Sequence, residues 1–199
     1  MVKPPLTLRS VRVQALTSHR RSYLECFGQR RCAGMVAVDQ APLQNAAPDW
    51  TLGSKGCYDA RTLAALQAAL RADMGAFADG NAACCLAAPL EDASLAALLR
   101  AETLRCDGGR RGALMADHTA RDWRPLLPTL RCRVLSVYGT ASGVFPQEGC
   151  AFVGAAALRG RNVPWEGAGH WLYLERPDAF ADLVAAFAAE CAADDRGGA

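Results

Sequence analysis

Two short, largely apolar runs place the tightest limits on how this chain can fold. They are residues 35–38 and, much further along the chain, residues 134–138. Neither run alternates between apolar and polar side chains, as a strand with one solvated face would. Residues typical of turns, Asp39 and Gly139, follow them directly. The pattern predicts two strands buried on both faces, as in a parallel sheet, and residues 161–165 are a shorter third candidate.

The long stretch between the two runs, residues 43–123, contains no strand pattern. Residues 59–77 carry apolar side chains at spacings of three and four, the period of a helix with one buried face. Asp59 is available to cap the first turn of that helix. Residues 92–104 repeat this pattern with Leu95, Leu98 and Leu99, and residues 111–118 are a third, short helix candidate. Three helices inserted between two strands predict a cap over one end of the sheet.

Helices also flank the predicted strands. One ends at Gly28, before the first strand, and others are expected at residues 147–158 and 177–193. The order is strand, helical insertion, strand, helix, strand, helix. This order predicts an α/β fold: a parallel sheet with flanking helices and a helical cap insertion.

The chain divides into parts by composition and pattern. These are a basic N-terminal segment (1–24), a core (25–42 and 124–193), the helical cap (43–123) and a tail (194–199), of which residues 195–199 are expected to be disordered. The first segment has no Asp or Glu but five basic residues: Lys3, Arg9, Arg12, Arg20 and Arg21. This composition is typical of an organellar transit peptide, and a short strand at 11–16 with basic flanks is the alternative. We expect a cytoplasmic protein, or a mitochondrial or plastid one if this segment is a transit peptide.

Composition argues against several classes of function. A net charge of +2 on 199 residues gives no strong field for nucleic acid or anionic membranes, and no run is apolar enough to predict a membrane span. The nine cysteines are odd in number and scattered, which favours reduced thiols over a disulfide scaffold. With only three histidines and no zinc-ligand spacing, we predict no metal site and no cofactor.

A histidine on a turn of small residues is the strongest candidate for chemistry. The sequence Gly169-His170-Trp171 follows the third predicted strand. It precedes Glu175-Arg176-Pro177, where the last helix is expected to begin. A turn of this kind presents an imidazole with little steric hindrance.

Four segments, in their joint order along the chain, resemble the α/β-hydrolase family. They are residues 36–42, 122–128, 134–146 and 169–177. The resemblance covers about residues 22–190 and is to the C-terminal portion of the family. It implies hydrolysis of a small apolar ester, thioester or similar carbonyl substrate by a nucleophile, an acid and a histidine base. His170 matches the base, which would take the nucleophile's proton and pass it to the leaving group.

The resemblance leaves the acid open. The usual acid of the family would fall near Ser142, but residues 139–146 contain no carboxylate. Some members carry the acid one strand earlier, at the position that Asp39 occupies, so Asp39 is the acid candidate. A turn residue after a strand is the alternative interpretation of Asp39. Asp117 and Asp122 are weaker candidates that also fit a helix end or the cap.

The nucleophile candidate is Ser18. The family's elbow, Gly-x-Ser-x-Gly, matches residues 16–20 only at the serine, because Leu16 and Arg20 replace the glycines. Large side chains there strain the sharp turn, so we expect activity that is reduced or absent. The alternative is a non-catalytic hydrolase-fold remnant, or a truncated gene product, that binds a ligand or a protein. The strands that precede the elbow in the family are expected to be missing, and an exposed sheet edge would favour self-association.

Overall fold

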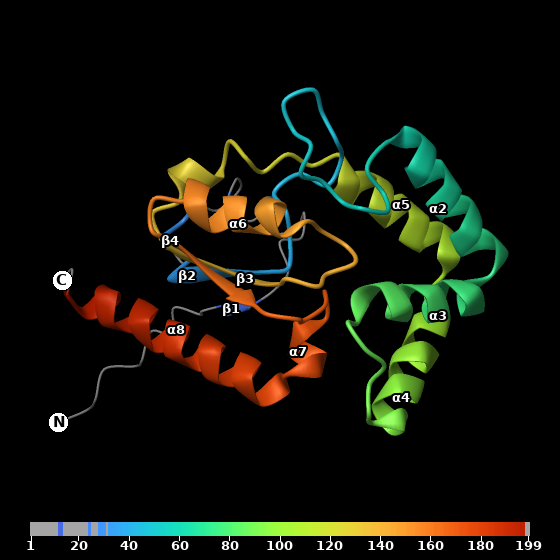
Figure 1. The fold of residues 1–199 in the computed structure, drawn as a ribbon. Helices are drawn as coiled ribbons and strands as arrows, with labels where there is room; N and C mark the ends of the chain where they lie inside the picture. The colour runs from blue at the N-terminus through green and yellow to red at the C-terminus, as the bar shows by residue number, and fades with distance from the viewer. Residues whose placement is uncertain (1–11, 14–23, 25–27, 31, 198–199) are drawn as a thin grey trace, which may run out of the picture.

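The computed structural model describes residues 12–13, 24, 28–30 and 32–197. Its centre is a parallel four-stranded sheet in the order β1-β2-β3-β4 (Figure 1). The strands are β1 (Arg12–Val13), β2 (Gly34–Val38), β3 (Arg133–Gly139) and β4 (Gly160–Trp165). The last three lie where the sequence predicts them, so the predicted α/β fold with a parallel sheet is confirmed.

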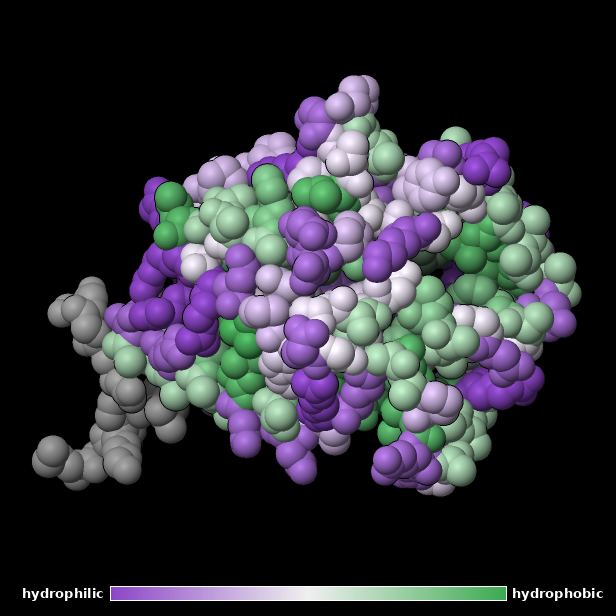
Figure 2. Space-filling model, viewed as in Figure 1, coloured by the Kyte–Doolittle hydropathy of each residue, from purple (hydrophilic) through white to green (hydrophobic). Residues whose placement is uncertain are grey.

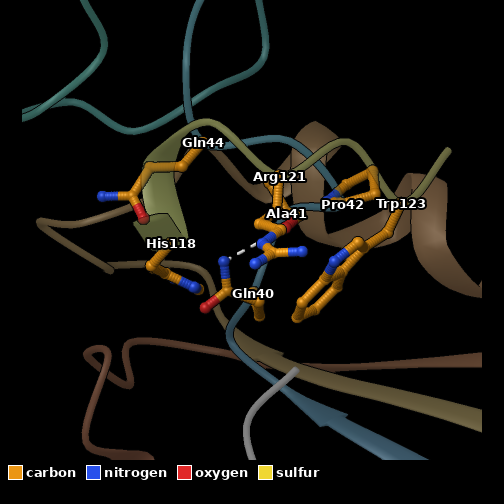
Figure 3. A pocket seen from close by; sticks show the side chains of 7 residues that line it. All are labelled: Gln40, Ala41, Pro42, Gln44, His118, Arg121 and Trp123. Carbon is orange, nitrogen blue, oxygen red and sulfur yellow. Dashed lines mark hydrogen bonds between the residues drawn. The ribbon is translucent and has the colours of Figure 1, made fainter. Parts of the chain in front are cut away.

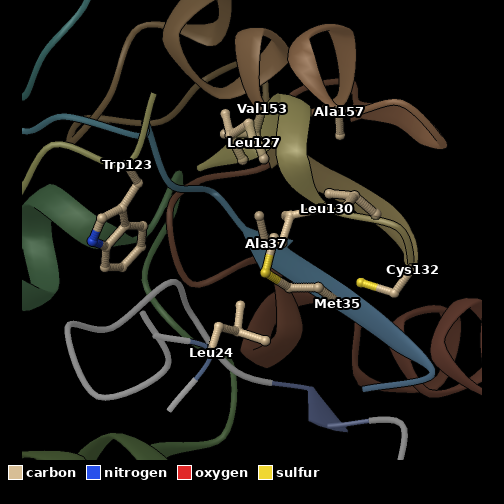
Figure 4. Packing of buried hydrophobic residues seen from close by; sticks show 10 residues of the cluster. Leu24, Met35, Ala37, Trp123, Leu127, Leu130, Cys132, Val153 and Ala157 are labelled. Atoms are coloured by element: carbon tan, nitrogen blue, oxygen red, sulfur yellow. The ribbon is translucent and has the colours of Figure 1, made fainter. Parts of the chain in front are cut away.

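Helices on both faces explain why the central strands are apolar without alternation. One face of the sheet packs against α6 (Gln147–Ala156) and the 3-10 turn η1 (Leu127–Thr129), in a cluster that includes Met35 and Val153 (Figure 4). The opposite face packs against α8 (Pro177–Gly197), with Val36 and Phe187 in its cluster. All five residues of β2 are buried. Successive side chains of a strand point to opposite faces, so both faces of β2 must be apolar.

The last helix is longer than the sequence predicts. α8 begins at Pro177, as expected, but it continues to Gly197. Asp194 explains the difference, because it forms ion pairs with Arg133 (2.7 Å) and with Arg159. These pairs attach the end of the helix to the start of β3 and to the residue before β4. The predicted disorder is therefore wrong over residues 195–197.

Four helices, rather than the predicted three, form the insertion between β2 and β3. They are α2 (Ala60–Ala72), α3 (Met74–Cys85), α4 (Ala93–Leu104) and α5 (Gly108–Thr119). The helix predicted at 59–77 is divided at Asp73, whose extended backbone ends α2. The Asp73 carboxylate accepts hydrogen bonds from the amides of Gly75 (2.8 Å) and Ala76 (3.0 Å) and so starts α3. The apolar spacing runs through this break, which is why it predicts one helix instead of two.

α4 is the least buried helix of the insertion. The leucine spacing of residues 95–99 predicts a buried face, but no residue of α4 is buried, and Leu98 and Leu104 are 55% and 44% exposed. The helix lies at the periphery of the molecule with α3 as its neighbour (Figure 1). The predicted buried face is therefore wrong. By contrast, Asp59 caps α2 as predicted, accepting a hydrogen bond from the amide of Thr62 at 2.7 Å.

The first described residues agree with two predictions. Gly28 has a φ of +67° and its amide donates to Leu24 O at 2.9 Å, as at a helix end. Residues 12–13 pair in parallel with β2, as the strand interpretation predicts for them. The other residues of 1–23 lie outside the described part of the chain, and with them the transit-peptide interpretation. Among the described helices, none combines the length and the apolar character that a membrane crossing requires.

Candidate active site

Asp39 follows β2 directly and projects its carboxylate at the carboxyl edge of the sheet. Its φ of +44° lies in the left-handed region, which Asp adopts more readily than most residues. Its amide donates to Val137 O at 2.7 Å and keeps the residue attached to β3. Asp39 is fully buried. A carboxylate removed from water in this way requires hydrogen-bond partners inside the protein.

Three polar groups surround the Asp39 carboxylate. Gly139 N donates to Oδ1 at 3.0 Å, whereas Ser142 Oγ and His170 Nδ1 lie 2.6 and 2.7 Å from Oδ2. Ser142 Oγ also accepts hydrogen bonds from the backbone amides of residues 144 and 145. The hydroxyl hydrogen of Ser142 is therefore directed to Asp39. Ser142 therefore holds the Asp39 carboxylate from the loop that follows β3.

His170 lies on the turn after β4, and about a fifth of its side chain (21%) is exposed. Because a carboxylate offers only acceptors, Nδ1 carries the hydrogen of the contact with Asp39. The neutral imidazole then has its lone pair on Nε2. The ring of Phe145 lies beside the imidazole, with the centroids 6.0 Å apart. An oriented imidazole with its lone pair on Nε2 can accept a proton from a nucleophile.

The histidine turn reaches the end of β3 because a glycine stands there. A Cβ at Gly139 would lie 2.1 Å from Ala168 O and 2.5 Å from Gly169 O, far inside van der Waals contact. Gly167, in the same turn, has a φ of +70°. Close approach and a left-handed residue together bring His170 to Asp39.

The insertion is hydrogen-bonded to the histidine turn. At the end of α3, Cys85 O accepts a hydrogen bond from Trp171 N at 2.8 Å. The Glu175 carboxylate, at the end of the unpredicted short helix α7 (Leu172–Glu175), accepts from Ala87 N at 2.7 Å and from Gly169 N at 2.9 Å. The sequence placed Glu175 only in the motif that starts the last helix. No spacing signal indicated that it joins two segments far apart in the chain.

Residues from other segments of the chain also fix the position of the loop that follows β3. Lys55 Nζ donates to Ser142 O at 2.5 Å, and Lys55 N donates to Val144 O at 2.8 Å. Gly143 lies against the end of α3, where a Cβ would be 2.4 Å from Cys84 O. Ser142 is thus fixed on both its backbone and its side chain, which fixes the partner of Asp39.

The two weaker acid candidates are bonded to arginines and not to His170. Asp117 forms an i,i+4 ion pair with Arg121 (2.6 Å), and Asp122 pairs with Arg124 (2.7 Å). Of the three acid candidates, Asp39 is the one bonded to His170. The nucleophile candidate Ser18 lies outside the described residues.

Two buried thiols near the pair are poor nucleophiles. Burial, followed by the neighbouring Cys84 and Asp39, raises the pKa of Cys85 to about 12. Burial, followed by the charge of Asp39, also raises the pKa of Cys150. The thiolate is the reactive form of cysteine. Both side chains therefore remain protonated at neutral pH.

The environment of His118 differs from that of His170. With Gln40, Arg121 and Trp123, His118 lines a depression that has no room for a water molecule (Figure 3). Burial lowers the pKa of His118, and its ring centroid is 6.2 Å from that of Trp123. Gln40 closes the base of the depression by donating to Ala41 O at 3.1 Å. Within the described residues, no three His, Cys, Asp or Glu side chains are grouped so as to hold a metal ion.

Comparisons with known proteins find likeness in structure only. No protein-family model matches the chain, and no curated protein matches its sequence. An esterase from Exiguobacterium antarcticum aligns with a TM-score of 0.76 at 16% identity, over 84% of this chain and 61% of its own. A bromoperoxidase from Bacillus anthracis gives 0.76 at 18% identity, over 88% and 65%. An esterase from Rhodococcus sp. gives 0.64 at 24% identity, over 84% and 59%.

These likenesses concern the fold. The chain spans between 59% and 65% of the length of these three proteins. Proteins this distant in sequence share an architecture without necessarily sharing an activity. The resemblance inferred from the four segments is confirmed at the level of the fold: the chain has a partial α/β-hydrolase fold.

Proposed function

We propose that this protein is a hydrolase of small ester or thioester substrates, with His170 as the general base and Asp39 as the acid that orients it. The observation that carries the proposal is the 2.7 Å contact between His170 Nδ1 and Oδ2 of the fully buried Asp39. A residue needed only to turn the chain would not require a buried carboxylate aimed at an imidazole. Esterases are among the solved structures with this fold, which supports the reaction class.

In this proposal the orientation of the base is set before any substrate binds. Three donors reach the Asp39 carboxylate, so its position does not depend on His170 alone. The carboxylate holds the Nδ1–H tautomer and stabilises the imidazolium that forms when Nε2 takes a proton. Ser142, although it stands at the family's usual acid position, acts here through Asp39.

Ser18 is the proposed nucleophile. Its Oγ attacks the carbonyl carbon while its proton passes to His170 Nε2. The proton then passes to the leaving oxygen or sulfur, the bond to that atom breaks, and an acyl-serine remains. Water then attacks the acyl carbon as it gives a proton to His170, the bond to Ser18 Oγ breaks, and His170 returns the proton to Oγ, which releases the acid and restores the serine. Leu16 and Arg20, in place of the elbow glycines, lead us to propose slow turnover.

A fluorophosphonate probe, with the labelled residue identified by mass spectrometry, tests this proposal. We expect labelling at Ser18 that is abolished in Ser18→Ala and strongly slowed in His170→Ala and Asp39→Asn. Matched controls are Ser22→Ala and His118→Gln, which should label like the unmodified protein. Labelling that is indifferent to His170→Ala would contradict the role of the base. A folded protein that takes up no probe would instead support the alternative of a non-catalytic, ligand-binding or protein-binding chain.

A further inference from the structure

Two cysteines that are 100 residues apart in the chain are in contact at the amino end of the sheet. Cys32 lies shortly before β2, and Cys132 directly precedes β3. Their Sγ atoms are 3.8 Å apart, with Cys32 as the donor of this contact. Both side chains pack in the cluster that includes Met35 and Val153, where Cys132 is drawn in Figure 4. The hydrolysis proposed above uses neither thiol.

The side chain of Gln29 holds the two segments that carry these cysteines together. Gln29 Nε2 donates to Thr129 O at 3.0 Å, and Gln29 Oε1 accepts from Arg131 N at 2.8 Å. Gln29 O also accepts from Cys32 N at 2.9 Å, which closes the turn on which Cys32 lies. The contact between the two sulfurs is therefore supported by hydrogen bonds on both sides of it.

A third thiol near the start of β2 lies on the other face of the sheet. Cys191 belongs to the cluster beneath α8, whereas Cys32 and Cys132 pack in the cluster on the opposite face. A Cβ at Gly34 would be 2.5 Å from Cys191 Sγ, so this thiol sits against the backbone of β2. Cys191 is therefore a matched buried cysteine that lies across the sheet from the pair.

The two sulfurs of the pair differ in their access to water. Cys32 is partly exposed, whereas only 7% of Cys132 is exposed. Hydrophilic residues gather at the left of Figure 2, over the amino end of β4 and the end of α8. They form ion pairs between Arg133, Arg159 and Arg161 on one side and Glu190 and Asp194 on the other. A small water-soluble oxidant can reach Cys32 from this polar surface.

We propose that Cys32 and Cys132 form a redox-active dithiol, which hydroperoxides oxidise to a disulfide and small thiols reduce again. The Cys32 thiolate attacks one peroxide oxygen, the O–O bond breaks, and the other oxygen leaves as water or an alcohol with the proton that Cys32 has lost. Cys132 Sγ then attacks the sulfenic acid at Cys32: the S–S bond forms, the S–O bond breaks, and the hydroxide takes the Cys132 proton as water. The two sulfurs lose two electrons, which the peroxide gains.

The contact between the thiols favours Cys32 as the sulfur that is oxidised first. The hydrogen bond with Cys32, followed by burial, raises the pKa of Cys132. Cys132 therefore remains protonated at neutral pH and can donate to a thiolate at Cys32, which reverses the direction of the hydrogen bond. The sulfenic acid then forms in van der Waals contact with the thiol that resolves it.

The disulfide would join β2 and β3 at their amino ends and close a loop that contains the whole helical insertion. Such a long loop loses much conformational entropy in the unfolded chain, so the oxidised protein should be the more stable form. We expect oxidation to raise the urea midpoint of unfolding by about 1–2 M. Asp39 lies at the opposite end of β2, so the inference does not depend on the proposed function.

Disulfide mapping of the unmodified protein tests the pairing. The folded protein is treated with equimolar hydrogen peroxide, the remaining thiols are blocked with N-ethylmaleimide, and the protein is digested with trypsin. Cleavage after Lys and Arg places Cys32 and Cys132 in separate peptides, 32–55 and 132–133, which contain no other cysteine. We expect these two peptides to be linked, and dithiothreitol to separate them. The absence of this link in the folded, peroxide-treated protein, or a link from peptide 32–55 to another cysteine, would overturn the proposal.

Variants identify the partners in the same assay. Cys32→Ser and Cys132→Ser should each abolish the link, and oxidation should no longer raise their urea midpoints. Cys191→Ala should form the link at the rate of the unmodified protein, whereas Gln29→Ala should form it more slowly. Loss of the link in Cys191→Ala, with the variant still folded, would overturn the proposal. So would an oxidised protein with a lower urea midpoint than the reduced one, because the disulfide would then not fit the native sheet.

Discussion

Replacement of Asp39 should cost stability in proportion to the hydrogen bonds that each substituent keeps. In Asp39→Ala, Gly139 N, Ser142 Oγ and His170 Nδ1 all lose their acceptor. Hydrogen bonds to a charged group contribute about 1.5–3 kcal/mol each. His170 is partly exposed and Ser142 can rotate, so the lower end of that range applies. Alanine at a φ of +44° adds about 1 kcal/mol. The expected loss in the free energy of unfolding is about 4–6 kcal/mol.

Asp39→Asn should be much milder. Its amide oxygen still accepts from Gly139 N, and asparagine tolerates the left-handed backbone. Its NH2 group then faces Ser142 and His170, so one or two contacts weaken at a cost of about 2 kcal/mol. His170 must present Nδ1 as an acceptor and carry its hydrogen on Nε2. In the serine proteases the corresponding change of tautomer lowers turnover about 10⁴-fold.

Urea unfolding of Asp39→Ala, Asp39→Asn and the control Asp117→Asn measures these differences. Asp117 is part of an exposed ion pair, so its replacement should cost less than about 1 kcal/mol. Ala and Asn variants that are equally stable, and both within 1 kcal/mol of the unmodified protein, would refute the reasoning. That result would mean that the carboxylate of Asp39 is not held by these three partners.

Three further predictions concern the surroundings of the site. Glu175→Ala should increase hydrogen exchange at the amides of Ala87 and Gly169 and lower turnover without abolishing it. Glu175→Gln keeps one acceptor oxygen and should restore part of the protection and part of the turnover. Unchanged exchange in Glu175→Ala would contradict the hydrogen bonds from Glu175 to these two amides. Among the described cysteines, the exposed Cys84 and Cys106 should react first with a thiol reagent at pH 8 in the native protein. Mass spectrometry identifies the modified residues. A buried cysteine that is modified equally fast would contradict this prediction. Arg133 and Arg159 lower the pKa of Asp194 to about 2, below the unfolded value of about 3.9, so its stabilising effect is present above pH 4 and is lost as the pH falls toward 2. Asp194→Asn should remove this pH dependence of unfolding, and an unchanged acid transition would count against it.

The sequence predicted the sheet well because its central strands are buried on both faces. A run such as residues 35–38 has no other stable environment in a chain of this size, and the following Asp39 marks the carboxyl edge. The His170 turn was equally clear, since small residues separate a strand from a helix there. These signals are local, and local patterns are what a single sequence displays.

The errors arise where long-range contacts decide the structure. Asp73 divides a continuous apolar pattern by capping a second helix, and Asp194 extends the last helix through arginines distant in sequence. Within the described part of the chain, α4 contacts α3 but none of its residues is buried, so the buried face predicted for it is wrong. The sequence already ranked Asp39 above Asp117 and Asp122, but its contact with His170 became visible only once the strand ends were brought together in space. Glu175 was expected only as part of the motif before the last helix, and no pattern indicated its link to Ala87 and Gly169, because both donors are backbone amides.

Long-range proton–nitrogen NMR correlation of the His170 imidazole tests the central claim most directly. The spectrum distinguishes the two neutral tautomers, and it can be assigned by its loss in His170→Ala. The Asp39–His170 contact predicts that the hydrogen lies on Nδ1 in the unmodified protein and moves to Nε2 in Asp39→Asn. A hydrogen already on Nε2 in the unmodified protein, or a spectrum that Asp39→Asn leaves unchanged, would contradict the assignment of Asp39 as the residue that orients the base.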